Sequence, residues 1–282
     1  MYANSVCTLT SMDLDISCCV SLIAMSDIEF EIDSRAIARV TINRPERKNA
    51  VTTEMWSTLG DIFDEVATNP SARAMVLQGA GGAFCAGADL SGRRIGADGD
   101  YIASMRKIGK VAESLFRLPK PTIAKVTGVA VGAGCNMALA CDLIVASNSA
   151  RFSEIFVKRG LSLDFGGSYI LPRLIGLHRA KELALFGDIL SAKEAQEIGL
   201  VNRVVADEEI DEFVDSWAKR LASGPSIAQS LSKSMLNDSL NRSLVDALEV
   251  ESFAQTVNFK SDDTAEAIKA FLEKREPNFT GR

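Results

Sequence analysis

The sequence predicts an α/β fold, with an α/β core over residues 25–206 and a helical C-terminal region over residues 207–282. Short apolar or alternating runs are separated by longer segments with helical spacing, which favours crossover helices and mostly parallel strands. From Gly166 onward, nearly every periodic segment is helical. The chain has 282 residues, 47% of them hydrophobic, which is enough apolar material for a large core.

The first elements of the core are expected to be a hairpin, a helix and a strand. Residues 28–33 and 36–45 alternate apolar and polar positions around Ser34, which is typical of an antiparallel hairpin. The run 72–79 is apolar and short, as expected of a buried strand. Between them, residues 52–67 place five apolar side chains at helical spacing: Met55, Leu59, Ile62, Phe63 and Val66.

The rest of the core continues the alternation of helices and strands. A helix is expected over 101–118, where Pro119 stops it, and a strand over 122–130. Ser191 is a good N-cap for a later helix, and Gly199 a good C-terminal stop. The remaining expected elements are strands at 142–147, 150–154 and 200–205, and helices at 166–176, 178–186 and 191–199.

Charge and hydropathy exclude two classes of partner. The formal net charge is -6 and the isoelectric point about 5.1, whereas nucleic-acid binders cluster Lys and Arg to meet phosphates. No apolar run approaches the roughly 20 residues that span a bilayer. We therefore expect neither a nucleic-acid partner nor a membrane span.

The N-terminal segment 1–24 is expected to be a disordered extension, with the folded domain beginning at Met25. Its apolar tract, 16–24, lacks a basic flank and follows Asp13 and Asp15, so it makes a poor signal peptide.

Cysteine and histidine usage favours a reduced, cytoplasmic protein without a metal site. The six cysteines form no C-x-x-C pair, and Cys135 and Cys141 lie in apolar sequence typical of buried thiols. His178 is the only histidine, which excludes a multi-histidine metal site. On a helix with basic neighbours, this side chain is expected to be structural or to face solvent.

Two glycine-rich turns stand out, at residues 79–90 ("GAGGAFCAGADL") and 126–147 ("VTGVAVGAGCNMALACDLIVAS"). Neither is a dinucleotide fingerprint, because "FCAGADL" interrupts the pattern, and neither contains the G-K-[ST] of a P-loop. Tight structural turns are the alternative interpretation. If the turns converge, however, their backbone N–H groups form an oxyanion hole.

These turns, together with "INRPERKNA", resemble the enoyl-CoA hydratase/isomerase family, also called the crotonase superfamily. The resemblance runs from about Asp27 to the end of the chain. It implies a spiral of β-β-α turns with a C-terminal trimerisation region, assembled as a homotrimer or a dimer of trimers. It also implies an acyl-CoA thioester substrate, with no cofactor beyond the coenzyme A it carries. The N–H groups of Ala88 and Ala133 are then expected to hold the thioester carbonyl.

The resemblance also implies contacts to coenzyme A. Arg47 and Lys48 are candidates to meet its phosphates, and Phe271 and Lys274 to reach the coenzyme A of a neighbouring subunit. Plain surface charge remains the alternative for the basic residues.

The chain departs from the hydratase pattern at two positions. In the family that the chain resembles, hydratases use two glutamates to activate water. One lies in "G-G-C-E" and the other in a later "P-E". The corresponding residues here are Asn136 and Phe156, neither of which exchanges a proton. Glu154 lies two residues before the second position, and we do not expect it to replace the missing acid.

Asp164, in "GLSLDFGGSY", occupies a position that is glycine in ordinary hydratases. Dienoyl-CoA isomerases resemble this chain in placing an aspartate there, and "DFGGSYILPRLIG" is most similar to ring-epoxide phenylacetyl-CoA isomerases. Chlorobenzoyl-CoA dehalogenases also use such an aspartate, but they need a histidine that residues 91–105 lack. The alternative is that Asp164 only caps the helix that follows.

The predicted function is therefore an acyl-CoA isomerase in which Asp164 moves a proton between carbons of the acyl chain, with apolar neighbours raising its basicity. Asn136 is expected to orient the substrate and Phe156 to line an apolar pocket, although core packing is the commoner use of such a ring. An enoyl-CoA hydratase and a non-catalytic CoA-binding protein remain as alternatives. The acyl group is left open.

Overall fold

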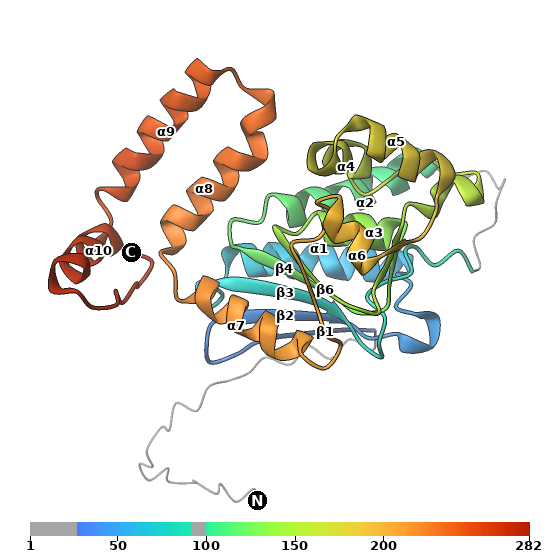
Figure 1. Cartoon of the computed structure of the whole chain (residues 1–282), viewed down its shortest axis with the longest axis horizontal. Coiled ribbons are helices and arrows are strands. Elements are labelled where there is room, and N and C mark those ends of the chain that lie inside the picture. The colour runs from blue at the N-terminus through green and yellow to red at the C-terminus, as the bar shows by residue number, and fades with distance from the viewer. Residues whose placement is uncertain (1–26, 92–99) are drawn as a thin grey trace, which may run out of the picture.

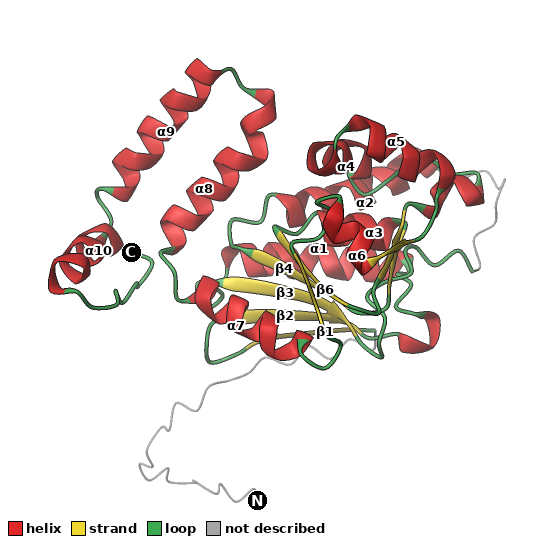
Figure 2. Ribbon diagram, in the orientation of Figure 1, coloured by secondary structure: helices red, strands yellow, loops and turns green. Residues whose placement is uncertain are grey.

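The computed structural model describes residues 27–91 and 100–282, which form an α/β core and a helical extension (Figures 1 and 2). The predicted α/β fold is confirmed, and the chain turns mainly helical after Gly166 as expected. The predicted N-terminal extension, residues 1–24, lies outside the described residues.

The main sheet has six strands in the order β1-β2-β3-β4-β6-β9. β1 and β2 form the predicted antiparallel hairpin, in which Ile28 pairs with Ile42, and all other pairs are parallel. The parallel strands place their carboxyl ends, and the turns that follow, at one edge of the sheet. The strands are β1 (Ile28–Ile32), β2 (Ile37–Ile42), β3 (Ala74–Gly79), β4 (Thr122–Val126), β6 (Leu143–Ser147) and β9 (Arg203–Val205).

The single strand expected over 122–130 is wrong, because the chain breaks it into β4 and β5 (Val129–Val131). Gly128 adopts a φ of 55°, and a Cβ at this position would lie 2.1 Å from the Gly82 carbonyl oxygen. Only glycine tolerates both the positive φ and this close approach. The turn directs β5 into a second, three-stranded sheet with β7 (Arg151–Ser153) and β8 (Leu190–Ser191).

Helices cover both faces of the main sheet. The larger buried cluster joins one face to α1 and its neighbours, while α7 packs on the other face through apolar residues such as Ile210 and Val214 (Figure 1). The short helix α3 begins at Ala133, directly after Gly132. The helices of the core are α1 (Thr53–Thr68), α2 (Tyr101–Phe116), α3 (Ala133–Leu139), α4 (Gly167–Ile175), α5 (Leu177–Phe186), α6 (Ala192–Glu197) and α7 (Ile210–Ala222), with short 3₁₀ turns η1 (Pro45–Arg47) and η2 (Ile155–Arg159).

The last three helices form a C-terminal arm that extends away from the core (Figure 1). The arm consists of α8 (Ser226–Asp238), η3 (Ser239–Asn241), α9 (Leu244–Asn258) and α10 (Asp262–Glu273). Lys233 on α8 joins it to the core through an ion pair of 2.7 Å with Asp142. Large apolar side chains are exposed along all three helices: Leu236, Leu240, Leu244, Val245, Leu248, Phe253, Val257, Ile268, Phe271 and Leu272.

Within the described residues, no helix combines the length and the apolar composition needed to cross a bilayer. In the same part of the chain, no three His, Cys, Asp or Glu side chains gather in a way that could hold a metal ion. His178 is exposed near the start of α5, consistent with the expected solvent-facing role.

Candidate functional site

The first glycine turn follows β3 and is held by Asn49, a buried residue with a φ of 59°. Its side-chain amide donates to the carbonyls of Ala80 (2.9 Å) and Ala83 (2.7 Å), and its Oδ1 accepts from the Arg44 N–H (2.8 Å). One side chain thus joins the segment before α1 to the turn. Sequence reasoning missed Asn49, although asparagine's tolerance of the left-handed region was a signal.

An ion pair closes the end of this turn. Arg44 Nη1 lies 2.6 Å from an oxygen of Asp89 and also donates to the Ala50 carbonyl (3.1 Å). Hydrogen bonds from Ser91, and then the Arg44 guanidinium, hold the pKa of Asp89 well below its usual range. Because the folded-state pKa is lowered, the ionised carboxylate stabilises the fold above the unfolded pKa near 3.8, and this contribution is lost as the pH falls.

We therefore expect Asp89→Asn to lower the melting temperature at about pH 7, and the difference from wild type to shrink below about pH 4. Melting curves across this range test the expectation. Glu46→Gln is the matched control, because Glu46 is exposed and only 3.7 Å from the same guanidinium. An equal effect of both substitutions would contradict a specific role for Asp89.

The N–H group of Ala88 is left pointing away from its neighbours. Val51 donates to the Gly87 carbonyl (2.8 Å) and accepts from the Asp89 N–H (2.9 Å). The residues before and after Ala88 therefore both bond to Val51, in one parallel bridge. In that geometry the intervening N–H faces away from Val51.

The second glycine turn leads from β5 into α3. Gly132, with a φ of 58°, is the N-cap, and Ala133 is the first helical residue. The N–H groups of a first helical turn have no partner within the helix and lie at the positive end of its dipole. The Ala133 N–H therefore points out of the helix end.

The two turns touch. Cys85 accepts from the Val131 N–H (3.0 Å), and a Cβ on Gly134 would lie only 2.3 Å from the Cys85 carbonyl oxygen. A Cβ on Gly87 would lie 2.8 Å from the Val131 oxygen and 3.5 Å from the Ala133 nitrogen. Across the described residues, neither Ala88 nor Ala133 donates its N–H to any protein group. Two available amide donors are thus brought to one place.

Asn136 and Phe156 lie beside the second turn. The Phe156 ring, 6% exposed, is 3.7 Å from the position of a Cβ on Gly132. Asn136 is fully buried on α3, and a Cβ on Gly167 would lie 2.3 Å from its amide nitrogen. The amide donates to the backbone carbonyl of Asp164 at 2.9 Å. The structure therefore brings Ala133, Asn136, Phe156 and Asp164 together.

Asp164 is half-buried on a tight turn before α4. Phe165 adopts a φ of 47°, rare for a bulky residue, and its ring lies 5.2 Å from that of Trp56 on α1. The Asp164 carbonyl accepts from the Gly167 N–H (2.9 Å), whereas no side chain caps α4 and its N-cap residue is Gly166. The alternative in which the Asp164 carboxylate caps this helix is therefore wrong.

Glu154 is a carboxyl that sequence reasoning set aside. β7 ends at Ser153 and the chain enters η2, so strand alternation does not apply, and the side chain is only 1% exposed. Burial raises the pKa of Glu154 to about 7; the Cys135 thiol and the Asn136 amide lower it in part, and the charge of Asp164 raises it. The structure thus places a second carboxyl beside Asn136.

The residues expected to contact coenzyme A fall into two groups. Arg47 and Lys48 are exposed, and the Lys48 carbonyl accepts from the Ala86 N–H (2.9 Å), so they lie at the rim of the first turn. Phe271 lies on α10 and Lys274 directly follows that helix; both are exposed, and α10 lies in the arm, away from α3 and α4 (Figure 1). One chain does not bring the two groups together.

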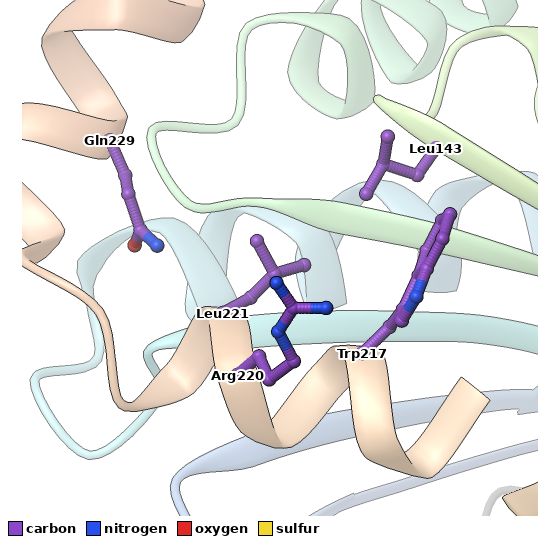
Figure 3. Close-up of a pocket in the computed structure, with 5 residues that line it drawn as sticks. All are labelled: Leu143, Trp217, Arg220, Leu221 and Gln229. Carbon is purple, nitrogen blue, oxygen red and sulfur yellow. The ribbon is translucent and has the colours of Figure 1, made fainter. Parts of the chain in front are cut away.

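Two cavities lie elsewhere in the described part of the chain. One of about 380 Å³ opens between α7, α8 and β6, as Figure 3 shows. A second, of about 500 Å³, lies next to it near the C-terminal segment and shares Arg220. No predicted site residue lines either of them. The first is lined by Leu143, Trp217, Arg220, Leu221 and Gln229.

Comparisons with known proteins identify the family and the fold. A family model described as enoyl-CoA hydratase/isomerase matches residues 33–282. The 1,2-epoxyphenylacetyl-CoA isomerase of Escherichia coli (strain K12) is 38% identical over 252 residues, covering 88% of this chain and 96% of that protein. The crotonyl-CoA hydratase of Syntrophomonas wolfei is 35% identical over 253 residues, covering 87% and 95%. The crystal structure of an enoyl-CoA hydratase from Bacillus anthracis superposes with a TM-score of 0.87 at 32% identity, covering 91% of this chain and 100% of that one.

The similarity extends over nearly all of the described residues, in sequence and in fold. It confirms the resemblance predicted from the glycine turns, including the likeness to the ring-epoxide isomerase branch. The chain belongs to the enoyl-CoA hydratase/isomerase family, the crotonase superfamily.

Proposed function

We propose that this protein isomerises an acyl-CoA thioester, using the backbone amides of Ala88 and Ala133 and the carboxylate of Asp164. The observation that carries the proposal is the meeting of two available amide donors with an aspartate held on a rigid turn. Coenzyme A enters only as part of the substrate, and no further cofactor is required.

The chemistry follows from the charge that develops on the substrate. The Asp164 carboxylate takes a proton from an acyl carbon, and the electron pair of the broken C–H bond delocalises onto the thioester oxygen. Two aimed N–H donors stabilise that oxyanion, at about 10²–10³ in rate per donor. The protonated Asp164 then returns the proton to a different carbon, so the double bond moves and the carboxylate is regenerated.

The neighbours of Asp164 favour isomerisation over hydration. Asn136 and Phe156 occupy the two positions at which hydratases of the family carry glutamates. This chain therefore has no acid at either position to activate water. The similarity to an epoxyphenylacetyl-CoA isomerase supports the same choice and points to ring-bearing acyl groups as a substrate class. Arg47 and Lys48 are placed to meet the phosphates of coenzyme A.

The second candidate is an enoyl-CoA hydratase, which the similarity to crotonyl-CoA hydratase favours. The third is a CoA-binding protein without turnover. Incubation with a 3-enoyl-CoA and, separately, with a 2-enoyl-CoA in deuterium oxide separates the three. Deuterium uptake with migration to the 2-enoyl isomer supports the isomerase, and 3-hydroxyacyl-CoA formed from the 2-enoyl substrate supports the hydratase. Binding without either product supports the non-catalytic protein.

We further propose that the chain assembles as a homotrimer or a dimer of trimers through the C-terminal arm. The arm exposes large apolar side chains that a monomer leaves in water, which is unfavourable. Assembly would also bring Phe271 and Lys274 of one subunit towards the site of another, which one chain alone does not do.

Substituting Phe253, 65% exposed on α9, by Asp is expected to weaken this assembly, because a charge would have to be buried. Light scattering measures the result: wild type should give a multiple of 30.3 kDa, and the variant a lower mass. Glu249→Gln, at an exposed site on the same helix, should leave the mass unchanged. A monomeric wild type would contradict the proposed assembly.

A further inference from the structure

The N–H groups of the first glycine turn have different kinds of acceptor along the turn. Backbone carbonyls of other segments accept at most positions: Val129 accepts from Phe84 and Cys85, Lys48 from Ala86, and Val51 from Asp89. The Gly87 N–H has no such carbonyl among the described residues and donates to the sulfur of Cys85, at 3.3 Å. A side chain therefore holds the peptide group directly before the one that carries the Ala88 N–H.

Cys85 also contacts the second glycine turn. Its carbonyl accepts from the Val131 N–H at 3.0 Å, and a Cβ on Gly134 would lie 2.8 Å from the Cys85 Cβ. The residue is fully buried, so the Gly87 N–H depends on the sulfur rather than on water. Burial raises the pKa of the Cys85 thiol to about 12, and the Gly87 backbone lowers it only in part. The thiol is therefore uncharged at neutral pH and touches both of the turns that supply the amide donors.

Loss of the sulfur would leave the Gly87 N–H buried without an acceptor. Sulfur is a weak acceptor, but a buried unpaired N–H is costly, so the peptide group would turn towards another partner. The peptide groups before and after Gly87 are joined through its Cα, where φ is 91°. Rotation of the first group therefore moves the second group, and with it the Ala88 N–H.

We propose that Cys85 is a positioning residue of the oxyanion site. Its sulfur fixes the peptide group before Gly87, which aims the Ala88 N–H at the same point as the Ala133 N–H. Because the thiol is uncharged, it does this without opposing the negative charge that develops on the thioester oxygen. The role rests on the proposed isomerase function, and it reaches the substrate only through the Ala88 amide.

The test compares the isomerase kinetics of Cys85→Ala and Cys85→Ser with those of wild type. Alanine removes the acceptor and keeps the Cβ, so kcat should fall about tenfold, a part of the roughly 10²–10³ that one oxyanion donor contributes, while KM changes by less than about twofold. The serine hydroxyl accepts from the Gly87 N–H, so this variant should keep kcat within about threefold of wild type. Both variants lack the volume of sulfur, so equal losses of kcat would indicate packing alone and overturn the proposal.

Cys141→Ala is the matched control. Cys141 is also buried, but it follows the C-terminal end of α3, where its thiol bonds to the Met137 carbonyl (3.7 Å). Its substitution should leave kcat and KM unchanged. Circular dichroism establishes which variants are folded. If Cys85→Ala does not fold, Cys85→Ser decides alone: a kcat close to that of wild type supports the role, and a loss of about tenfold or more overturns it.

A second measurement does not depend on turnover. Butanoyl-CoA, labelled isotopically at the carbonyl carbon, is bound to each protein, and the carbonyl stretching frequency is read from infrared difference spectra. Two aimed N–H donors should lower this frequency in wild type and Cys85→Ser, and lower it less in Cys85→Ala. This pattern in a protein without isomerase activity would support the role of Cys85 and contradict the proposed function alone. Equal frequencies in wild type and folded Cys85→Ala would overturn the role of Cys85 whatever the activity.

Discussion

Replacing Asp164 by asparagine is expected to lower kcat for double-bond migration by about 10²–10⁴-fold, the usual contribution of a positioned acid or base. Asparagine has nearly the same shape but takes up no proton from the substrate. The backbone carbonyl that accepts from Gly167 and Asn136 is unchanged, so the turn should keep its structure. Steady-state kinetics and exchange of the substrate proton with deuterium oxide measure the loss.

Asp61→Asn is the matched control, because it makes the same chemical change on an exposed position of α1. It should retain the kcat of wild type. If Asp164→Asn also retained full isomerase turnover, the proposed mechanism would be wrong, since no other carboxylate on this turn is available.

Replacing Gly134 by alanine is the substitution with the second-largest expected effect. The new Cβ would lie 2.3 Å from the Cys85 carbonyl oxygen and 2.8 Å from its carbonyl carbon, so the two glycine turns must separate. The Ala88 and Ala133 amides would then no longer converge on one oxygen. We expect kcat to fall by about 10²–10³-fold, and the free energy of unfolding by about 1–3 kcal/mol from overpacking.

Gly109→Ala is the control for this substitution. Gly109 is exposed within α2 and a Cβ there meets nothing within 4 Å, so alanine should stabilise the helix by up to about 1 kcal/mol and leave kcat unchanged. Circular dichroism establishes which variants are folded at the assay temperature. A folded Gly134→Ala protein with wild-type kcat would show that the amide pair is not the oxyanion site.

The parts of the site that lie within one motif were predictable from the sequence. The two glycine turns, the missing acids at Asn136 and Phe156, and the unusual Asp164 are all local features of the chain. The helices were predictable for the same reason, since their apolar spacing and caps are local. The break of the strand over 122–130 at Gly128 was not, because it depends on the Gly82 carbonyl, which is close in space and distant in sequence.

The supporting roles of four residues were also not predicted from the sequence. Asn49, the Arg44–Asp89 pair and Glu154 act on groups that other segments supply, and apart from the left-handed tolerance of Asn49 no local pattern separates them from ordinary polar residues. Glu154 was set aside because strand alternation and motif alignment describe neighbours along the chain. Its raised pKa comes from burial, which only the packed structure determines.

By itself, the sequence determined the α/β class, the family and the identity of the one acid on the turn before α4, because short-range patterns and motifs encode them. Tertiary structure alone decided that two amides from separate turns converge, that Asn136 holds the Asp164 backbone, and that Glu154 lies buried beside them. The physical reason is that convergence, donor counting and desolvation depend on distances between segments, and these exist only once the chain has folded.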